Sequence, residues 1–248
     1  MYIFGDIGNT ETKICLVSLN NKILKKTTFL SKDINQNKLN KFFSDLKLDY
    51  KKIQKILFCS VVPKSFNLIK KFLLKKTQIR CYEVKNLNLR SLIKIKVNYK
   101  QVGSDRITNA ISLLDRKNNF IIVDFGTATT FDVLIKDSYT GGVIAPGIKL
   151  SLNTLSDKAT LIPRINLKKI RSIIGKDTIS AVRSGFFWGY AGLIDNIINL
   201  IKKDIRKPFK VIITGGFSNL FKKSIKTKVS HNKDITINGL IKISKLIN

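Results

Sequence analysis

The feature that most constrains the fold is a pattern that occurs twice: an apolar strand runs into Asp-x-Gly-(Asn/Thr), and a second apolar strand follows. The first copy is Tyr2–Lys13, with Asp6 at the turn. The second copy is Phe120–Ile135, with Asp124 at the turn, 118 residues after Asp6. A pattern of this length repeated in one chain predicts a duplicated structural unit rather than two unrelated turns.

The tips of these two hairpins suit two interpretations. Gly and Asn tolerate the backbone angles of tight turns, so each tip can be a plain structural turn. A tip without bulky side chains also lets backbone N–H groups point at an anion, and a neighbouring Asp can hold a cation or its water shell. Because both tips share this chemistry, we interpret them as a pair of phosphate loops that face each other across a cleft.

The order of predicted elements is the same in both halves of the chain. The first half predicts strands at 2–7, 13–19, 23–30, 56–60 and 81–84 and helices from Leu39 to Leu46 and over 64–76, the second of them opened by Pro63. The second half predicts strands at 120–125, 130–136, 140–145 and 210–214, with helices between and after them. This order favours an α/β fold with two mixed sheets, divided into 1–117 and 118–248, with a helix over 104–117 crossing between them.

Composition describes an ordinary globular chain with an unusual charge. Of its 248 residues, 44% are hydrophobic and 25% are charged, yet 46 Lys and Arg against 16 Asp and Glu give a net charge of +30. The basic residues are spread along the whole chain, so we assign them to solvated faces and expect no nucleic-acid partner. Heavy use of Lys, Ile and Asn also resembles the bias of AT-rich genomes. The positive field would still attract anionic substrates.

The cysteines and the single histidine give no sign of a metal centre. Cys15, Cys59 and Cys81 lie in apolar, strand-like runs without a Cys-x-x-Cys pair, as expected for buried thiols of a cytoplasmic protein. His231 has no cluster of possible ligands near it in the sequence. Because the first residues already form a strand pattern, we expect no signal peptide.

One glycine-rich run, Ser184–Ile194, is the most apolar stretch of the chain. It is too short to span a membrane, so we expect no membrane association. We interpret it as a buried helix in which Gly185, Gly189 and Gly192 permit close packing against another helix, from this chain or from a second subunit.

The segment Gly103–Arg106 precedes an amphipathic run and is open to two interpretations. Ser104 could cap the helix while Asp105 only favours its positive end. Alternatively, Asp105 is a general base at the start of the helix and Arg106 binds an anionic group. Spacing alone does not separate the two.

Three further loops have the same ambiguity between packing and binding. Within Gly141–Gly147, the stretch Gly142–Gly147 comes near the spacing of a Walker loop, but Ile148 stands where the lysine would be, so any nucleotide must be held another way. Gly175–Thr178 opens the glycine-rich helix, where Thr178 is either part of the first turn or a hydroxyl offered to substrate. Thr214–Gly216 follows a strand where a nucleoside could lie against backbone.

Together these segments resemble the type III pantothenate kinases, which belong to the superfamily of acetate and sugar kinases, heat-shock chaperone ATPases and actin. The resemblance covers almost the full chain, in the order and spacing of the family. It includes Asp6–Lys13, Ser60–Pro63, Val102–Arg106, Val123–Thr130, Gly141–Gly147, Gly175–Thr178 and Thr214–Gly216. It implies two ribonuclease H-like domains with mixed sheets, in the duplicated architecture of actin-like ATPases, with the active-site cleft between them.

The resemblance also implies an activity, the ATP-dependent phosphorylation of pantothenate to 4′-phosphopantothenate, the first step of coenzyme A biosynthesis. It implies that Asp105 is the general base and that pantothenate is bound by Gly103, Ser104, Asp105, Arg106 and Thr178. It implies that ATP is bound by Asp6, Ile7, Gly8, Asn9, Thr10, Glu11, Thr12, Lys13 and Thr127. Asp124 would bind a monovalent cation, K⁺ or NH₄⁺, and a divalent cation such as Mg²⁺ would accompany the nucleotide. The implied protein is a cytoplasmic homodimer with the glycine-rich helix near its interface.

The chain departs from the family before Gly103. Where the family usually has an aromatic residue, any residue, Asn and Pro, this chain has Lys96–Tyr99, so the rim of the pantothenate pocket differs. Lys96 could attract the pantothenate carboxylate, or binding could have become weaker. Two other functions are considered: a superfamily ATPase that switches protein partners, for which we expect a further domain, and a nucleic-acid-binding or regulatory protein that has lost catalysis. Asp6, Asp105 and Asp124 at the ligand loops argue against lost chemistry.

Overall fold

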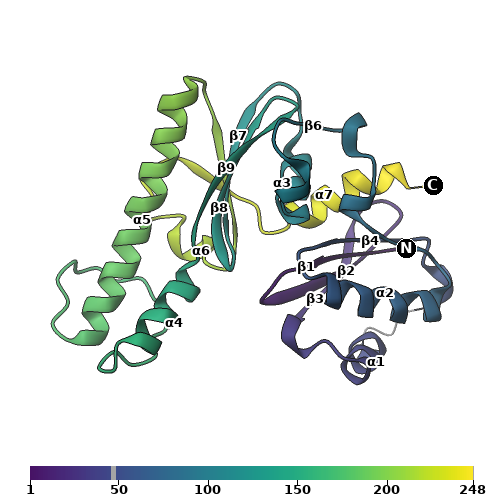
Figure 1. The fold of residues 1–248 in the computed structure, drawn as a ribbon, viewed down its shortest axis with the longest axis horizontal. Coiled ribbons are helices and arrows are strands. Elements are labelled where there is room, and N and C mark those ends of the chain that lie inside the picture. Colours follow the sequence, from purple (N-terminus) through teal and green to yellow (C-terminus); the bar gives the residue numbers. More distant parts are fainter. Residues whose placement is uncertain (46–48, 248) are drawn as a thin grey trace. The chain divides into compact units, whose positions relative to one another are not determined.

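The computed structural model describes residues 1–45 and 49–247, which form two compact units (Figure 1). Unit 1 contains Met1–Leu114 and the C-terminal segment that begins at Asp234, and unit 2 contains Asp115–Lys233. The helix expected from Leu39 to Leu46 is present as α1 (Gln36–Asp45), and Leu46 lies outside the described residues.

Unit 1 is built on a five-stranded mixed sheet with the order β3-β2-β1-β4-β5. Its strands are β1 (Tyr2–Ile7), β2 (Glu11–Val17), β3 (Ile23–Leu30), β4 (Lys55–Ser60) and β5 (Cys81–Glu83). Its helices are α1, α2 (Pro63–Thr77), α3 (Ser104–Leu113) and α7 (Ile235–Ile243). Short elements join them: η1 (Ser31–Asp33), η2 (Tyr50–Lys52), η3 (Val84–Asn86), η4 (Leu89–Ser91), β6 (Lys94–Ile95), η5 (Tyr99–Gln101) and η6 (Ser244–Leu246).

Unit 2 repeats this arrangement with the strand order β11-β10-β7-β8-β9. Its strands are β7 (Asn119–Phe125), β8 (Ala128–Ile135), β9 (Ser138–Pro146), β10 (Lys210–Gly215) and β11 (Val229–His231). Its helices are α4 (Ile148–Lys158), α5 (Thr178–Ile205) and α6 (Ser218–Phe221). In both units a hairpin of three antiparallel strands is extended by two parallel strands, so the duplication predicted from the repeated pattern is confirmed.

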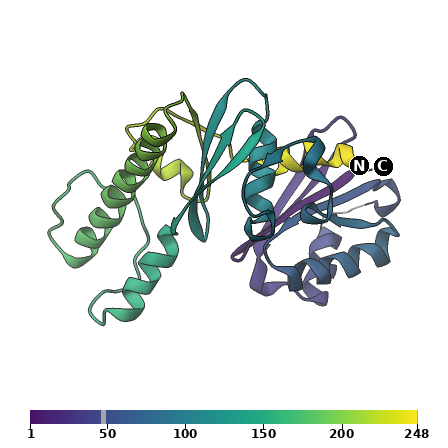
Figure 2. The ribbon, with the colours of Figure 1, turned by 45° about the horizontal axis from the view of Figure 1, so that its top comes forward.

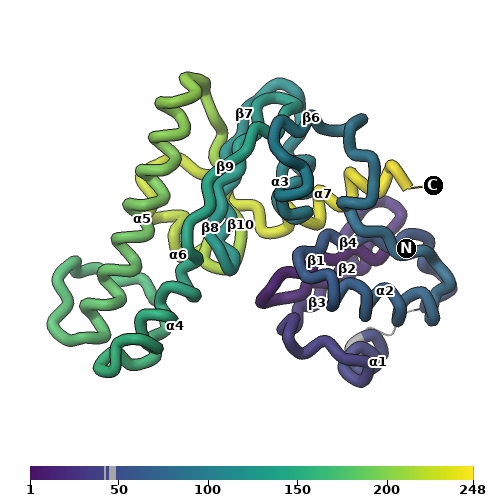
Figure 3. The backbone as a smooth tube through the Cα atoms, in the orientation of Figure 1, coloured from purple at the N-terminus to yellow at the C-terminus, as the bar shows by residue number. Residues whose placement is uncertain are grey.

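Alternation along β1 decides what each face of the first sheet presents. Ile3 and Ile7 enter the apolar core formed with α1 and α2. Phe4 and Asp6 therefore point to the opposite face, on which α3 and α7 pack against β4 and β1. Figure 3 shows α3 and α7 side by side. The period of two thus places a carboxylate on the face that carries the helix of the Gly103–Arg106 segment.

The ends of the helices follow local chemistry. Pro63 opens α2 as expected, and Gln78 ends it in the left-handed conformation. The helix expected over 104–117 ends earlier, at Leu113. The Asp115 carboxylate accepts hydrogen bonds from the backbone N–H groups of Lys117 and Asn118 at 2.9 and 2.8 Å, which stabilises a turn instead of another helical turn.

The C-terminal segment packs in unit 1, whereas the sequence division at 117 and 118 placed it with the second half. The reason is the fit between α7 and α3. A Cβ at Gly239 would lie 2.1 Å from the carbonyl oxygen of Thr108, so only glycine allows this approach. The Thr236 hydroxyl donates to the Asn109 side chain at 2.8 Å, and Lys26 on β3 pairs with Asp234 before α7 begins.

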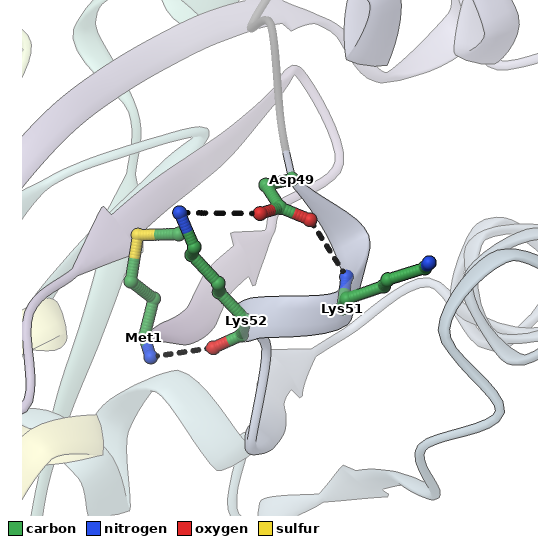
Figure 4. Close-up of polar contacts among 4 residues, drawn as sticks. All are labelled: Met1, Asp49, Lys51 and Lys52. Atoms are coloured by element: carbon green, nitrogen blue, oxygen red, sulfur yellow. Dashed lines mark hydrogen bonds and ion pairs between the residues drawn. The ribbon is translucent and has the colours of Figure 1, made fainter.

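The N-terminal amine and Ile247, the last described residue, both contact residues at or just before the start of β4. The N-terminal amine donates to the carbonyl of Lys52 at 2.7 Å, while the Asp49 carboxylate accepts from the backbone N–H of Lys51 and pairs with the Lys52 ammonium (Figure 4). Lys55 donates to the backbone carbonyl of Ile247 near the other end of the chain. Figure 2 shows the two termini next to each other.

The glycine-rich helix differs from the expectation of a buried helix. α5 is 28 residues long, and only one of its faces is covered, where Phe187, Ala191, Ile194 and Ile198 pack on the sheet of unit 2 (Figure 1). Its glycines are exposed, with no atom within 4 Å of a Cβ built on Gly185, Gly189 or Gly192. Over the described ranges 1–45 and 49–247, no helix is long and apolar enough to cross a membrane.

Candidate active site

The site of unit 1 begins with a row of three side chains across three strands. Asp6 on β1 is paired in register with Lys13 on β2 and with Cys59 on β4. Residues paired in this way present their side chains on the same face of a sheet. The Cys59 thiol donates to the Asp6 carboxylate, with 3.5 Å between Sγ and Oδ1. The carboxylate is therefore held between an ammonium and a thiol.

Ser104 fastens the first turn of α3 to the end of β4. Its hydroxyl donates to the carbonyl oxygen of Ser60 at 3.0 Å and accepts from the Ser60 N–H at 2.8 Å. The idea that Ser104 caps the helix is wrong, because Gly103 is the capping residue and no side chain caps this end. Ser104 is 1% exposed, and its hydroxyl joins α3 to β4. Its contact with pantothenate stays a prediction.

Gly103 makes room for the Asp105 carboxylate. A Cβ built on Gly103 would lie 2.3 Å from Oδ1 of Asp105, so any larger residue would displace the carboxylate. That same oxygen accepts a hydrogen bond from the backbone N–H of Arg106 at 2.8 Å. The side chain thus folds back over the start of its own helix, which fixes its position.

Electrostatics couples Asp6 and Asp105. Burial, with Asp105 adding repulsion, raises the pKa of Asp6 to about 6, although Lys13 and Cys59 oppose the change. Burial also raises the pKa of Asp105, against the N–H and the guanidinium of Arg106 and the Lys85 ammonium. Burial and then Asp6 raise the pKa of the Cys59 thiol well above its usual range, so it stays protonated and able to donate. Two carboxylates in such an environment attract cationic or proton-donating ligands.

The tip of the first hairpin is braced by a residue that sequence reasoning missed. The Ser31 hydroxyl donates to the carbonyl of Gly8 at 2.6 Å and lies 2.9 Å from the Thr12 hydroxyl, and its N–H donates to the carbonyl of Thr10 at 3.0 Å. The N–H of Gly8 is used within the turn, where it donates to the Glu11 carbonyl at 3.0 Å. A serine that follows a third strand carries no sequence signal for this role.

The predicted ATP-binding residues of this hairpin differ in how they are presented. Ile7 and Thr12 are fully buried, so any contact of theirs with a nucleotide is through backbone. The remaining residues are partly buried or exposed: Asp6, Gly8, Asn9, Thr10, Glu11 and Lys13. Their role in holding phosphate stays a prediction.

The altered rim, Lys96–Tyr99, is joined to a second group of residues that the sequence did not point to. The Tyr99 hydroxyl donates to the carbonyl of Lys85 on η3 at 3.2 Å. Glu83, just before η3, accepts from the Lys85 N–H at 2.7 Å, and burial raises the pKa of Glu83. Beside the rim lies a pocket of about 310 Å³, lined by Leu87, Asn88, Leu89, Arg90, Ile93, Ile95 and Tyr99. Lys96 itself is exposed.

The second hairpin, in unit 2, has the same plan with different neighbours. Asp124 on β7 is paired with Thr130 on β8 and Thr214 on β10, so hydroxyl-bearing residues stand where unit 1 has Lys13 and Cys59. Gly215 has φ +88°, and a Cβ there would lie 2.5 Å from Oδ1 of Asp124. Gly215, the last residue of β10, therefore lies directly against this carboxylate.

Thr127 and Thr178 are both exposed in unit 2. Thr127 lies in the β7–β8 turn, and its carbonyl oxygen would be 2.0 Å from a Cβ on Gly147, the residue that caps α4. Thr178 is the first residue of α5, where Asp177 and Ser180 form the capping box. The Thr178 hydroxyl takes no part in that capping box, and its contact with pantothenate stays a prediction.

Neither hairpin forms a complete metal site from protein ligands. Within the part of the chain that the structure describes, no group of three or more His, Cys, Asp or Glu side chains could hold a metal ion. A cation at Asp124 would take further ligands from backbone carbonyls, hydroxyls or water, which suits K⁺ and similar hard ions. The partly buried Asp124 carboxylate, flanked by Thr130 and Thr214, fits such an ion.

The chain is similar in sequence to proteins of one family. The family model described as type III pantothenate kinase matches residues 2–200. A type III pantothenate kinase of Pelagibacter ubique is 66% identical over 247 residues, covering 100% of both chains. One of Sulfurihydrogenibium sp. is 36% identical over 256 residues, covering 99% of this chain and 100% of that protein.

Among solved structures, the activator of 2-hydroxyisocaproyl-CoA dehydratase from Clostridium difficile, with bound ADPNP, is similar in fold. It has a TM-score of 0.55 at 12% identity, covering 99% of this chain and 95% of that one. The duplicated actin-like architecture with mixed sheets is therefore confirmed, and so is the family that the motifs predicted. The chain belongs to the type III pantothenate kinases.

Proposed function

We propose that Asp105 is the general base of this pantothenate kinase. In the reaction the O–H bond of the primary hydroxyl of pantothenate breaks and its proton passes to Asp105, while the hydroxyl oxygen forms a bond to the γ-phosphorus of ATP and ADP leaves. The observation that supports this most directly is the position of Asp105, fixed at the start of α3 and coupled to Asp6 on the nucleotide hairpin. Burial raises the pKa of Asp105, which makes the carboxylate a better proton acceptor near neutral pH.

The first hairpin is suited to the ATP phosphates. Phosphoryl transfer needs alignment and neutralisation of charge rather than covalent help. We assign alignment of the ATP phosphates to the hairpin tip, Asn9–Glu11, which hydrogen bonds from Ser31 hold in place. We assign neutralisation to Lys13, which lies beside Asp6 in register, and to the divalent cation that accompanies the nucleotide. In unit 2 we assign Thr127 to ATP.

Bound cations would supply positive charge for the phosphates. We assign Asp124 to a monovalent cation, K⁺ or NH₄⁺, because its carboxylate is flanked by Thr130 and Thr214 and closely covered by Gly215. Mg²⁺ is best carried on the phosphates themselves, since it keeps several waters and needs few protein ligands. The reduced thiols Cys15, Cys59 and Cys81 support a cytoplasmic location.

The exposed face of α5 supports a homodimer. Gly185, Gly189 and Gly192 recur along one exposed face, and they would let a second helix approach closely. Exposed apolar side chains are found at Ile179, 39% exposed, and at Ile174, 77% exposed, on and before this helix. We expect Gly189→Glu to give monomers by light scattering while far-UV circular dichroism stays unchanged. A dimer that persists in this variant would place the interface elsewhere.

The test of the proposed base measures ADP release with ATP, Mg²⁺ and K⁺, with and without pantothenate. We expect release that depends on pantothenate, and a loss of about 10²-fold or more in Asp105→Asn. Asp33→Asn is the matched control, since it removes one carboxylate at the surface, where Asp33 pairs with Lys38. Near-normal turnover in Asp105→Asn would remove Asp105 from the role of base. Release indifferent to pantothenate in the unaltered chain would overturn the proposed reaction.

A further inference from the structure

The rim residue Tyr99 and its neighbour Lys100 both contact Lys85, and we call these contacts the clasp. The Tyr99 hydroxyl donates to the carbonyl of Lys85 at 3.2 Å. The Lys85 ammonium donates in turn to the carbonyl of Lys100 at 3.0 Å and lies 5.8 Å from the centre of the Tyr99 ring. Lys85 is thus held at two points, its backbone carbonyl and the charged end of its side chain.

The clasp lies next to the start of α3. η3, which carries Lys85, packs against both β4 and α3. The N–H of Lys85 also donates to the Glu83 carboxylate at 2.7 Å. The Ser104 hydroxyl joins α3 to β4 at the same place. The element that carries Lys85 is therefore packed beside the helix that begins with the Gly103–Arg106 segment.

We propose that Lys85 is a positioning residue for the catalytic carboxylate of Asp105, held in place by its clasp to Tyr99 and Lys100. Burial opposes ionisation of Asp105, and a positive charge held near it favours the ionised form that accepts a proton. Lys85 attracts the ionised form of both Asp105 and Glu83, and so lowers the pKa of each against the effect of burial. The inference rests on the proposed function, since it concerns how the base of that reaction is kept ionised.

Other charged or titratable groups lie on the elements around Asp105. They are Asp6 on β1, Lys13 on β2, Cys59 on β4, Glu83 on β5 and Arg106 on α3. Just before α7, which packs along α3, Asp234 pairs with Lys26, and on α7 Lys242 donates to the carbonyl of Leu114. On β4, Lys55 donates to the carbonyls of Ser244 and Ile247. Lys85 and Arg106 both favour ionised Asp105.

The clasp depends on two groups of the Tyr99 side chain. Its hydroxyl donates to the Lys85 carbonyl, and its aromatic ring lies near the Lys85 ammonium. The clasp gives the altered rim a function in tuning the base, separate from any attraction of Lys96 for the substrate carboxylate.

The test is the pH dependence of kcat/KM for pantothenate, because a purely structural role would not move it. We expect Lys85→Gln to shift the acid limb upward by about half a pH unit, less than the 1–3 pKa units of a direct ion contact. Lys85→Arg keeps the positive charge, so its acid limb should lie at the same pH as that of the unaltered chain. Tyr99→Phe loses the hydroxyl, and its acid limb should shift upward by less than that of Lys85→Gln. Lys71→Gln, at an exposed position on α2, is the control for loss of one positive charge.

Each result separates the inference from its alternatives. An unmoved acid limb in Lys85→Gln, with folding intact by circular dichroism, would overturn the positioning role. A higher KM for pantothenate without a shifted limb would mean that Lys85 binds substrate instead, and would also overturn it. Lys96→Gln provides the comparison, since it should raise KM without moving the limb. If the unaltered chain shows no pantothenate-dependent release of ADP, the proposed function itself fails.

Discussion

The raised pKa of Asp6 predicts that its ionised carboxylate lowers the free energy of unfolding. The substitution Asp6→Asn tests this prediction. Asparagine has nearly the shape of aspartate and keeps an oxygen that can accept from the Cys59 thiol. It removes the charge that burial and Asp105 make unfavourable. We therefore expect the variant to be more stable than the unaltered chain at neutral pH, although it should lose activity.

The magnitude follows from the pKa of Asp6, raised from 3.8 to about 6. Because the folded chain holds this proton more tightly, the contribution of Asp6 to stability is greatest below 3.8 and is lost as pH rises through about 6. At 1.36 kcal/mol per pKa unit, the ionised carboxylate costs ~3 kcal/mol near pH 7.5 and only ~1 kcal/mol near pH 4.5. The advantage of Asp6→Asn should therefore fall from ~3 kcal/mol near pH 7.5 to ~1 kcal/mol near pH 4.5.

The assay is urea unfolding followed by far-UV circular dichroism at both pH values, without nucleotide and with EDTA. The only tryptophan, Trp188, lies in unit 2, so its fluorescence would not report on unit 1. Glu11→Gln, at an exposed position of the same hairpin, is the control and should change stability by less than ~0.5 kcal/mol. A variant that is no more stable than the unaltered chain near pH 7.5, or an advantage independent of pH, would refute the reasoning.

Three further predictions follow from close contacts. Gly103→Ala should lower kcat by about 10²-fold with little change in Tm, because its Cβ displaces the Asp105 carboxylate but its backbone conformation suits alanine; a large fall in Tm would contradict this. Gly239→Ala should lower the free energy of unfolding by ~1–3 kcal/mol in urea titrations, since the new methyl group meets the Thr108 carbonyl, and an unchanged midpoint would show that α7 can shift. Ser31→Ala should raise KM for ATP several-fold in steady-state assays, because the hairpin loses its brace, whereas an unchanged KM would separate the brace from nucleotide binding.

The sequence was informative about elements whose pattern is local. The repeated Asp-x-Gly hairpins predicted the duplication, and the expected strands β1, β3, β4, β7 and β10 are present within one or two residues at their ends. Pro63 marked the start of α2 correctly. Motif order gave the family, because turn residues and their spacing are properties of the chain itself.

Other features could not be read in this way. α7 was not predicted, since its run of isoleucines and Thr236 has strand propensity and only its packing on α3 makes it a helix. The glycines of α5 suggested burial, yet their face is exposed. Local pattern describes how a segment can pack and does not say which surface covers it.

The sequence by itself determined the duplicated α/β plan, the family and the residues with the right chemistry, because each depends on neighbours along the chain. Tertiary structure decided which of them act together. Only the register of β1, β2 and β4 places Asp6 between Lys13 and Cys59, and only the packing of α3 brings Asp105 into the field of Asp6. The physical reason is that burial and charge repulsion, which set the pKa of each carboxylate, depend on atoms distant in sequence.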